Sequence, residues 1–558
     1  MEDAALQSLH AGLARADARR DEVLARIAAS ARTDLAGLPP GAAALLLSRG
    51  ELGPTLVLTG DGDKAVRAAE DLRFFLGGDR DQVLLYPSLD TTPFLDVAPD
   101  RRTAMDRLAT LFHLTRELPW RFLVAPAPAV LRRVPPKAAV DARSLLIEAE
   151  GELERDDLID VLTAGGYLRV PVAEDPGTFA VRGGIIDVYP PHAQYPARIE
   201  LDDWLVLSIK LFDPDDQRTV ESVDRIFVHP ARDTVLTAAD RDRALTRIRD
   251  LCDEANVPTK KRNQLLEDLE AGRAFYGVEG FLPAFYDHLE TLLDYIPAEA
   301  PVVLLDPTDI TKSLDLELTR AIEDRAAKAE DGAPVYPLDA LYADEGELVA
   351  RLEERKRVVV HELAIVGAPS YEESPTALYE SVGEDDVIQL GAEDQRPLVA
   401  ELKARRQAGS DEGLQPVVDR AKRWLDMGLR VVFTARTHTQ AERLVSLLKG
   451  YDVPVLATGP KGHPAAFDPA ILEGPPPAAV QIVVGELNDG FAWATEGLVV
   501  VTEQEIFGTR TRRRRQKRQP PLTTSTPKPI APKAKSAPCR FSHPGPSTSH
   551  GSVSVRRL

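Results

Sequence analysis

The chain has 558 residues, of which 44% are hydrophobic and 28% are charged, values typical of a globular protein with several domains. It contains no run of eighteen apolar residues and its charged amino-terminal stretch lacks a signal-peptide core, so the sequence predicts neither a membrane span nor secretion. The two cysteines, Cys252 and Cys539, lie far apart, which favours a cytoplasmic protein and argues against disulfides and metal sites.

The charge is unevenly distributed along the chain. The net charge is −20, but residues 509–558 hold thirteen Lys and Arg and no acidic residue, which leaves the first 508 residues at −33. An acidic surface repels phosphate groups and is poorly suited to general DNA binding. We therefore expect any nucleic-acid contact to be local or to come from the tail.

The first 125 residues are predicted to be an α/β domain. Apolar runs at 55–58, 83–85 and 122–124 are separated by stretches of helical periodicity, the predicted helices being residues 4–31, 64–76 and 101–115. Strands that alternate with helices predict a parallel sheet.

The turn after the first strand lies where a phosphate-binding loop would be expected. Such a loop needs glycines that let backbone amides surround phosphate, then Lys and a Ser or Thr that binds Mg²⁺. Gly60, Gly62 and Lys64 match part of this pattern, but Asp63 and Ala65 replace the last glycine and the hydroxyl. We interpret the loop as degenerate and expect no bound nucleotide, no metal, no cofactor and no catalytic residue here.

Residues 166–218 are predicted to form a small antiparallel β-module. Short apolar runs alternate with turn residues in this stretch, and the predicted strands are centred on Val181, Ile186, Ile199 and Ile209. A last strand-like run, 225–228, follows the module. In its middle, the sequence Arg182-Gly183-Gly184 places a cation beside backbone that bends freely. We interpret Arg182 as a partner-binding rather than a structural residue, because a lone buried arginine needs a costly partner.

The rest of the chain divides by composition. Residues 238–274 have helical periodicity, residues 302–305 and 358–360 are apolar like strands, and residues 368–393 are polar enough for a linker. Residues 394–508 again alternate between predicted helices and strands, which indicates a second α/β domain.

The tail, residues 509–558, is basic and is predicted to be disordered. From Pro520 onward it has eight prolines, no acidic residue and no apolar periodicity. The abrupt change of composition favours a frameshift near residue 519. The alternative is a genuine basic tail that binds nucleic acid.

The β-module also carries a resemblance. The stretches PGTFAVRGGIIDVYPP, YPARIEL and LFDPDDQRT resemble the second domain of bacterial transcription-repair coupling factors, and the excision-nuclease subunit UvrB is similar over the same region. Upstream, YPSLDTTPF resembles a segment of the family in which Trp is usual where Leu89 stands here. UvrB has an aromatic, DNA-gripping hairpin after this segment, whereas only six residues separate Phe94 from Arg101.

The resemblance implies a domain order and a partner. It implies a discontinuous UvrB-like domain of residues 1–125 and 220–367, interrupted by an inserted UvrA-binding module at 126–219. The residues that match the family's UvrA-binding positions are Arg169, Phe179, Arg182 and Gly183, while Ala180 departs from an arginine that UvrB-type sequences often have. The alternative is that these residues only build the sheet.

The resemblance also implies a function in transcription-coupled nucleotide-excision repair. The intact family recognises RNA polymerase stalled at a DNA lesion, releases it with an ATP-driven DNA translocase and recruits UvrA. Since the sequence shows no motor motif, we expect this chain to keep the UvrA-recruiting part and not to be an enzyme. RNA polymerase and DNA would be partners of the intact family.

The sequence leaves two other hypotheses open. A UvrB-like excision-nuclease subunit would need a working phosphate loop and the aromatic hairpin. An acidic scaffold with a basic DNA-binding tail would bind DNA in a salt-dependent way that is lost when residues 509–558 are deleted.

Overall fold

The computed structural model of the chain describes residues 20–78, 82–142, 144–232, 238–270, 277–362, 386–407, 414–459 and 462–508. Most of the predicted linker and the whole basic tail lie outside these residues, so the predictions of disorder and of a frameshift stay predictions. The helix predicted over residues 4–31 is described only from Arg20, and it ends before a strand at 32–36 that the sequence pattern had not indicated.

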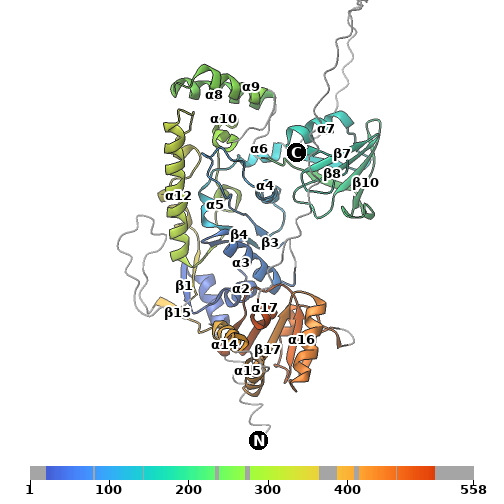
Figure 1. The fold of residues 1–558 in the computed structure, drawn as a ribbon, viewed down its shortest axis with the longest axis vertical. Coiled ribbons are helices and arrows are strands. Elements are labelled where there is room, and N and C mark those ends of the chain that lie inside the picture. Colours follow the sequence, from blue (N-terminus) through green and yellow to red (C-terminus); the bar gives the residue numbers. More distant parts are fainter. Residues whose placement is uncertain are drawn as a thin grey trace, which may run out of the picture. The chain divides into compact units, whose positions relative to one another are not determined.

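The first part of the chain is built on a seven-stranded parallel sheet (Figure 1). Its strands come from both sides of the β-module in sequence. In spatial order they are β15 (Val387–Gln389), β1 (Arg32–Ala36), β14 (Arg357–His361), β13 (Val302–Leu305), β2 (Thr55–Thr59), β4 (Phe122–Pro126) and β3 (Val83–Leu85). All five residues of β2 and of β4 are buried, as expected for a parallel sheet covered on both faces.

Helices cover the sheet and separate its strands in sequence. The long helix α12 (Pro307–Glu330) follows β13 directly (Figure 1). The other helices of this part are α2 (Pro40–Arg49), α3 (Gly62–Phe75), α4 (Arg101–Thr115), α5 (Ala127–Leu131), α6 (Lys137–Ala142), α8 (Ala238–Glu254), α9 (Thr259–Glu270), α10 (Leu282–Phe285), α11 (Leu292–Tyr295) and α13 (Glu345–Glu353), with 3-10 turns at Val278–Phe281 and Leu338–Ala340. The stretch predicted as one helical region, 238–274, is divided into α8 and α9, because Pro258 disfavours helical backbone at Val257.

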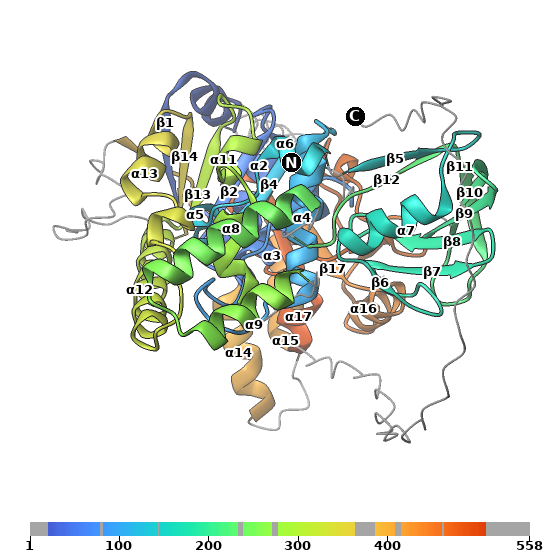
Figure 2. The ribbon, with the colours of Figure 1, turned by 90° about the horizontal axis from the view of Figure 1, so that it is seen from above.

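The β-module is a separate antiparallel sheet with a short helix, seen from above in Figure 2. Its strands, in spatial order, are β11 (Thr219–Val223), β10 (Leu205–Phe212), β9 (Ala197–Asp202), β8 (Ile185–Tyr189), β7 (Thr178–Arg182) and β6 (Leu168–Arg169); β6 pairs in parallel with β7. A two-stranded ribbon of β5 (Leu145–Glu148) and β12 (Arg225–Val228) and the helix α7 (Arg155–Ala164) complete it. Arg101 at the start of α4 donates a hydrogen bond of 2.8 Å to the Gly177 carbonyl and thereby ties the module to the first sheet's domain.

The last part of the described chain is a second mainly parallel sheet. In spatial order its strands are β16 (Glu393–Asp394), β21 (Phe491–Trp493), β22 (Leu498–Thr502), β17 (Arg430–Ala435), β20 (Val480–Val484) and β18 (Val455–Ala457), with β19 (Ala465–Ala466) beside β20. Its helices are α14 (Arg396–Gln407), α15 (Gln415–Asp426), α16 (His438–Gly450) and α17 (Glu503–Phe507), with 3-10 turns at Pro469–Leu472 and Ala494–Glu496.

The two parallel sheets are not independent bodies. One buried apolar cluster includes Leu72 and Phe75 of α3 together with Val483, Phe491 and Trp493 of the second sheet. The ring of Phe74 stacks on that of Phe467 at a centroid distance of 4.2 Å. Burial of this shared surface is what holds the second sheet against α2 and α3.

The predicted fold class, a multidomain α/β protein with an inserted antiparallel β-module, is confirmed. One detail of the predicted linker, 368–393, is corrected: its residues 387–389 form β15, which pairs in parallel with β1 at the edge of the first sheet. The polar composition concealed this strand, because an edge strand of three residues needs little apolar surface. Among the described residues, no helix is long and apolar enough to span a membrane, and no cluster of three metal-ligating side chains occurs.

Candidate protein-interaction site

A tight hairpin presents the predicted partner-binding arginine. Strands β7 and β8 pair antiparallel, with Arg182 opposite Ile185, and Gly183 and Gly184 make the turn. Gly183 has a φ of +62°, in the left-handed region that favours glycine. A Cβ at Gly184 would lie 2.5 Å from the Leu201 carbonyl oxygen, so only glycine allows β9 to approach the turn this closely. The glycine pair is therefore explained by backbone geometry.

Arg182 itself is exposed at the end of β7. Its Nη2 donates a hydrogen bond of 3.0 Å to the Pro171 carbonyl. This corrects the argument that Arg182 is a buried cation in need of a partner. An exposed guanidinium fixed by one backbone contact directs its remaining N–H donors to solvent, where they are available to an acidic partner.

Arg169 lies on the neighbouring edge strand. Strand β6 pairs with β7 so that Arg169 is opposite Phe179, and both residues of β6 are exposed. Pro171, two residues after Arg169, accepts the hydrogen bond from Arg182, so Arg182 contacts the chain segment that follows β6. Leu168, 53% exposed beside Arg169, adds an apolar side chain that the sequence analysis had not selected.

Phe179 is not part of this surface. Its side chain is fully buried and belongs to the module's core with Leu158, Ile186 and Ile199. The prediction that Phe179 contacts the partner is therefore not supported by its position. Since strand residues alternate between the two faces of a sheet, a buried Phe179 instead fixes how β7 lies against α7.

The outer face of the sheet holds an ion pair that the sequence pattern had not indicated. Arg198 of β9 binds the carboxylate of Asp187 on β8 with two hydrogen bonds, of 2.7 and 2.9 Å. Asp187 is only 1% exposed, and the Arg198 guanidinium also lies 4.5 Å from the centroid of the Phe212 ring. The hydrogen bonding of Arg198 to the Asp187 carboxylate, which accepts, outweighs desolvation and raises the pKa of Arg198. Ala180, opposite Asp187 across the hairpin, is itself buried.

The degenerate loop after β2 is occupied by the protein's own carboxylates. Lys64 Nζ lies 2.8 Å from Asp309 Oδ2 and 3.7 Å from Asp306 Oδ2, both at the start of α12. A Cβ at Gly60 would lie 1.7 Å from Asp309 Oδ2, and the Asp61 side chain accepts a 2.8 Å hydrogen bond from the Lys64 amide. Burial lowers the pKa of Lys64, but the hydrogen bond and charge of Asp309 outweigh it and raise that pKa.

This arrangement opposes phosphate binding, because a phosphate would have to displace Asp309 from Lys64 and from Gly60 and to approach Asp61. At Gly62, in the first turn of α3, an added Cβ would lie 3.6 Å from the Ser88 hydroxyl, which is ordinary contact distance. The absence of bound nucleotide stays a prediction. The sequence could not reveal Asp309 as the partner of Lys64, because 245 residues separate the two.

Residues 145–233 match the family described as the UvrB interaction domain. The chain is 32% identical over 524 residues to the transcription-repair-coupling factor of Myxococcus xanthus, covering 91% of this chain and 42% of that protein. The chain is homologous to the amino-terminal part of the transcription-repair-coupling factors. The factor of Bacillus subtilis strain 168 is 26% identical over 530 residues, covering 92% of this chain and 40% of that protein.

The resemblance to the transcription-repair-coupling factors is thereby confirmed for most of the chain. The chain spans about two fifths of the length of the relatives that match most of it. The factor of Escherichia coli K12 matches over a shorter stretch, at 26% identity over 313 residues, covering 55% of this chain and 26% of that protein. The matched interaction domain, 145–233, begins at β5 and ends just after β12, so both strands of the ribbon fall inside it.

Proposed function

We propose that this chain acts in transcription-coupled nucleotide-excision repair as the UvrA-recruiting part of a transcription-repair-coupling factor. The match of residues 145–233 to the UvrB interaction domain supports the proposal, as does the similarity to coupling factors along most of the chain. The single observation that carries it is the exposed Arg182 at the tip of the β7–β8 hairpin, with few intramolecular contacts to compete with a partner.

The proposed docking surface consists of Leu168, Arg169, Arg182 and Gly183. It combines two exposed cations with one exposed apolar side chain on a rigid strand edge. Arginine is enriched among the residues that dominate protein interfaces, because its planar guanidinium makes directional, charge-assisted hydrogen bonds. A free Cβ position at Gly183 leaves room for a partner to approach the turn closely.

We also propose that the chain as it stands hydrolyses no ATP. The loop of Gly60, Gly62 and Lys64 is the place where the first domain would hold phosphate, and Asp309 occupies it. The translocase activity and the contacts with RNA polymerase and DNA are proposed only for a protein that also carries the remaining three fifths of its relatives.

The alternative of a UvrB-like excision-nuclease subunit finds no support in the described residues. Between Phe94 and α4 the chain makes only a short loop at residues 95–100, without strands. A DNA-gripping hairpin would have to occupy this position.

Titration of the chain with purified UvrA tests the proposal. Wild type, Arg182→Ala and Arg182→Glu are compared, with Arg218→Ala as the matched control because Arg218 is an exposed arginine in the β10–β11 turn. Loss of a central interface arginine typically costs about 2–4 kcal/mol, so Arg182→Ala should weaken binding by roughly 30-fold or more and Arg182→Glu further. Circular dichroism establishes that all four proteins are folded. Equal binding by all of them removes Arg182 from the interface, and no binding by the wild type contradicts the recruiting function.

A further inference from the structure

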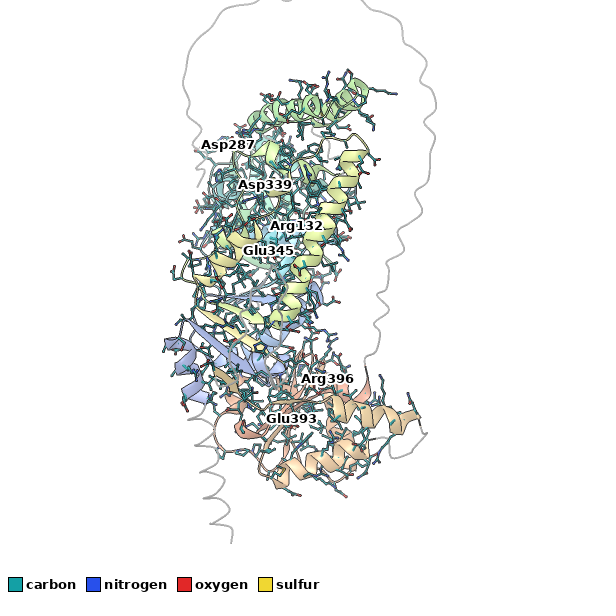
Figure 3. The ribbon with its side chains drawn as sticks, turned by 90° about the vertical axis from the view of Figure 1, so that its left-hand side faces the viewer. Arg132, Asp287, Asp339, Glu345, Glu393 and Arg396 are labelled. Atoms are coloured by element: carbon teal, nitrogen blue, oxygen red, sulfur yellow. The ribbon has the colours of Figure 1, made fainter. Side chains whose placement is uncertain are left out.

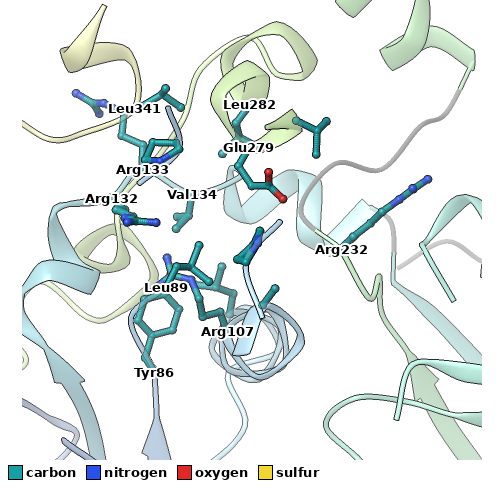
Figure 4. A pocket seen from close by; sticks show the side chains of 15 residues that line it. Tyr86, Leu89, Arg107, Arg132, Arg133, Val134, Arg232, Glu279, Leu282 and Leu341 are labelled. Carbon is teal, nitrogen blue, oxygen red and sulfur yellow. The ribbon is translucent and has the colours of Figure 1, made fainter. Parts of the chain in front are cut away.

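A cavity of about 150 Å³ lies in the first domain, away from the β-module hairpin (Figure 4). It is enclosed by the segment between β3 and α4, by α4 itself, by residues 132–134 after α5 and by residues 278–282. Its apolar lining includes Leu89, Pro93, Leu111, Val134, Val278 and Leu282. An apolar cavity of about this volume is large enough to hold a benzene ring.

Arg107, which has no carboxylate partner among the residues that the structure describes, forms one wall of the cavity. Arg107 is only 4% exposed. Its contacts among the described residues are a 2.7 Å hydrogen bond to the Pro87 carbonyl and the Tyr86 ring, whose centroid lies 4.2 Å from the guanidinium carbon. Figure 4 shows Tyr86, Leu89 and Arg107 side by side at the cavity wall. A buried guanidinium that only a carbonyl and an aromatic ring stabilise favours the arrival of an anion.

The neighbouring Arg132, also buried, is neutralised by a carboxylate. Arg132, labelled in Figure 3 beside α12, lies 2.8 Å from Glu317 Oε1, and the Tyr342 hydroxyl donates a 2.8 Å hydrogen bond to the same oxygen. In the described part of the chain, Arg107 has no counterpart of Glu317. Among the described lining residues, the carboxylate is that of Glu279, whose side chain is directed toward the cavity in Figure 4. Glu279 disfavours a second negative charge on any occupant.

We propose that this cavity is a binding site for a small organic monoanion, a carboxylate attached to an apolar group about the size of a six-membered ring. The carboxylate pairs with Arg107, and the ring occupies the space beside Leu89. The site is independent of UvrA recruitment, since it shares no residue with the surface around Arg182.

Calorimetric titration of the full chain with benzoate tests the proposal, with benzamide as the neutral isostere and acetate as the anion without a ring. Benzoate should bind with a dissociation constant of about 1 mM or tighter, and benzamide and acetate at least roughly tenfold more weakly. Arg107→Met should reduce benzoate affinity about tenfold. Leu89→Trp should abolish binding, and Arg102→Met, on the exposed side of the same helix, should leave it unchanged.

Three outcomes of these titrations would contradict the proposed binding site. Equal binding of benzamide and benzoate removes the role of Arg107, and benzoate binding that survives Leu89→Trp places the ligand elsewhere. No heat of binding at about 10 mM benzoate shows that the cavity is only a packing void. If Arg107→Met does not fold, Leu89→Trp alone decides, because it adds volume without removing a charge.

Discussion

Asp71 of α3 and Asn488 of the second sheet's domain are joined by two hydrogen bonds. The Asn488 backbone amide and its Nδ2 donate to Asp71 Oδ1 at 2.9 and 3.0 Å. On the other side of the same turn, the Gly490 amide donates to Glu505 Oε1 at 2.9 Å. The carboxylates of Asp71 and Glu505, from different parts of the chain, therefore hold the turn at residues 488–490. This turn lies where the two parallel sheets share their apolar core.

The first prediction is that Asp71 makes stability depend on pH. Burial, and to a lesser degree the charges of Asp489 and Glu70, raise the pKa of Asp71 to about 7, although the hydrogen bonds from Asn488 lower it. The folded chain thus keeps a proton that the unfolded chain loses near pH 4, so this group's contribution to stability falls as pH rises from about 4 to 7 and is constant above. Asp71→Asn should be more stable than wild type at pH 8, by at most about 4 kcal/mol, and the gap should close toward pH 5.

Urea unfolding at several pH values between 5 and 8 measures this difference. Glu505, whose pKa burial also raises to about 7, is present in both proteins, so its contribution cancels. Glu70→Gln is the matched control, because Glu70 accepts one hydrogen bond from the same Asn488 side chain at 3.0 Å but is not fully buried. Parallel stability curves for wild type and Asp71→Asn would show that Asp71 is ionised throughout.

The second prediction separates a core role from a surface role in the β-module. Phe179→Ala removes a fully buried ring from the module's core and should cost about 3–5 kcal/mol of stability. Arg182→Ala removes an exposed side chain with one backbone contact and should change stability by less than about 0.5 kcal/mol. Thermal unfolding followed by circular dichroism compares them. A large loss in Arg182→Ala would mean that this arginine is structural.

Elements with a strong local signal could be predicted from the sequence. Strands β3 and β13 and helix α4 have the predicted bounds, because each is a compact apolar run or a continuous helical pattern between turn residues. Strands β1 and β15 could not be found in the same way. Residues 32–36 combine Arg, Thr and Asp with two apolar residues, and they become a strand only because β14 and β15 pair with them from more than 300 residues away.

The candidate site was predictable from the sequence only where it depends on neighbouring residues. The local motif around Arg182 and Gly183 marked the hairpin correctly, since turn chemistry depends on neighbouring residues. Burial depends on the whole fold, so the sequence could not distinguish an exposed Arg182 from a buried one or exclude Phe179 from the surface. The pairs Lys64–Asp309 and Asp71–Asn488 join residues that are 245 and 417 positions apart, and only the fold brings them together.

The third prediction concerns the Arg198–Asp187 pair. Arg198→Met would leave the Asp187 carboxylate buried without its two charge-assisted hydrogen bonds, and breaking such a pair costs about 3–5 kcal/mol. Lys210→Met on the next strand is the control. It breaks a partly exposed pair with Glu200, at 2.9 Å, and should cost less than about 1 kcal/mol. Similar urea midpoints for the two variants would contradict a structural role for the buried pair.

The last prediction is that the loop after β2 binds no nucleotide. Millimolar Mg-ATP should leave the melting temperature of the chain unchanged, and no phosphate release should be detected, because Asp309 already pairs with Lys64 and occupies the space against Gly60. Lys64→Ala should also unfold with nearly wild-type stability, since the pair is partly exposed and worth less than about 1 kcal/mol. Asp309→Asn serves as the second variant. It removes the charge that competes with phosphate but leaves the space against Gly60 unchanged. Asp63 and Ala65 still stand where a phosphate-binding loop needs Gly and a hydroxyl, so Mg-ATP should still not shift the melting temperature. A rise in melting temperature with Mg-ATP that disappears in Lys64→Ala would show that the loop binds nucleotide after all, and that Asp309 is displaced when it does.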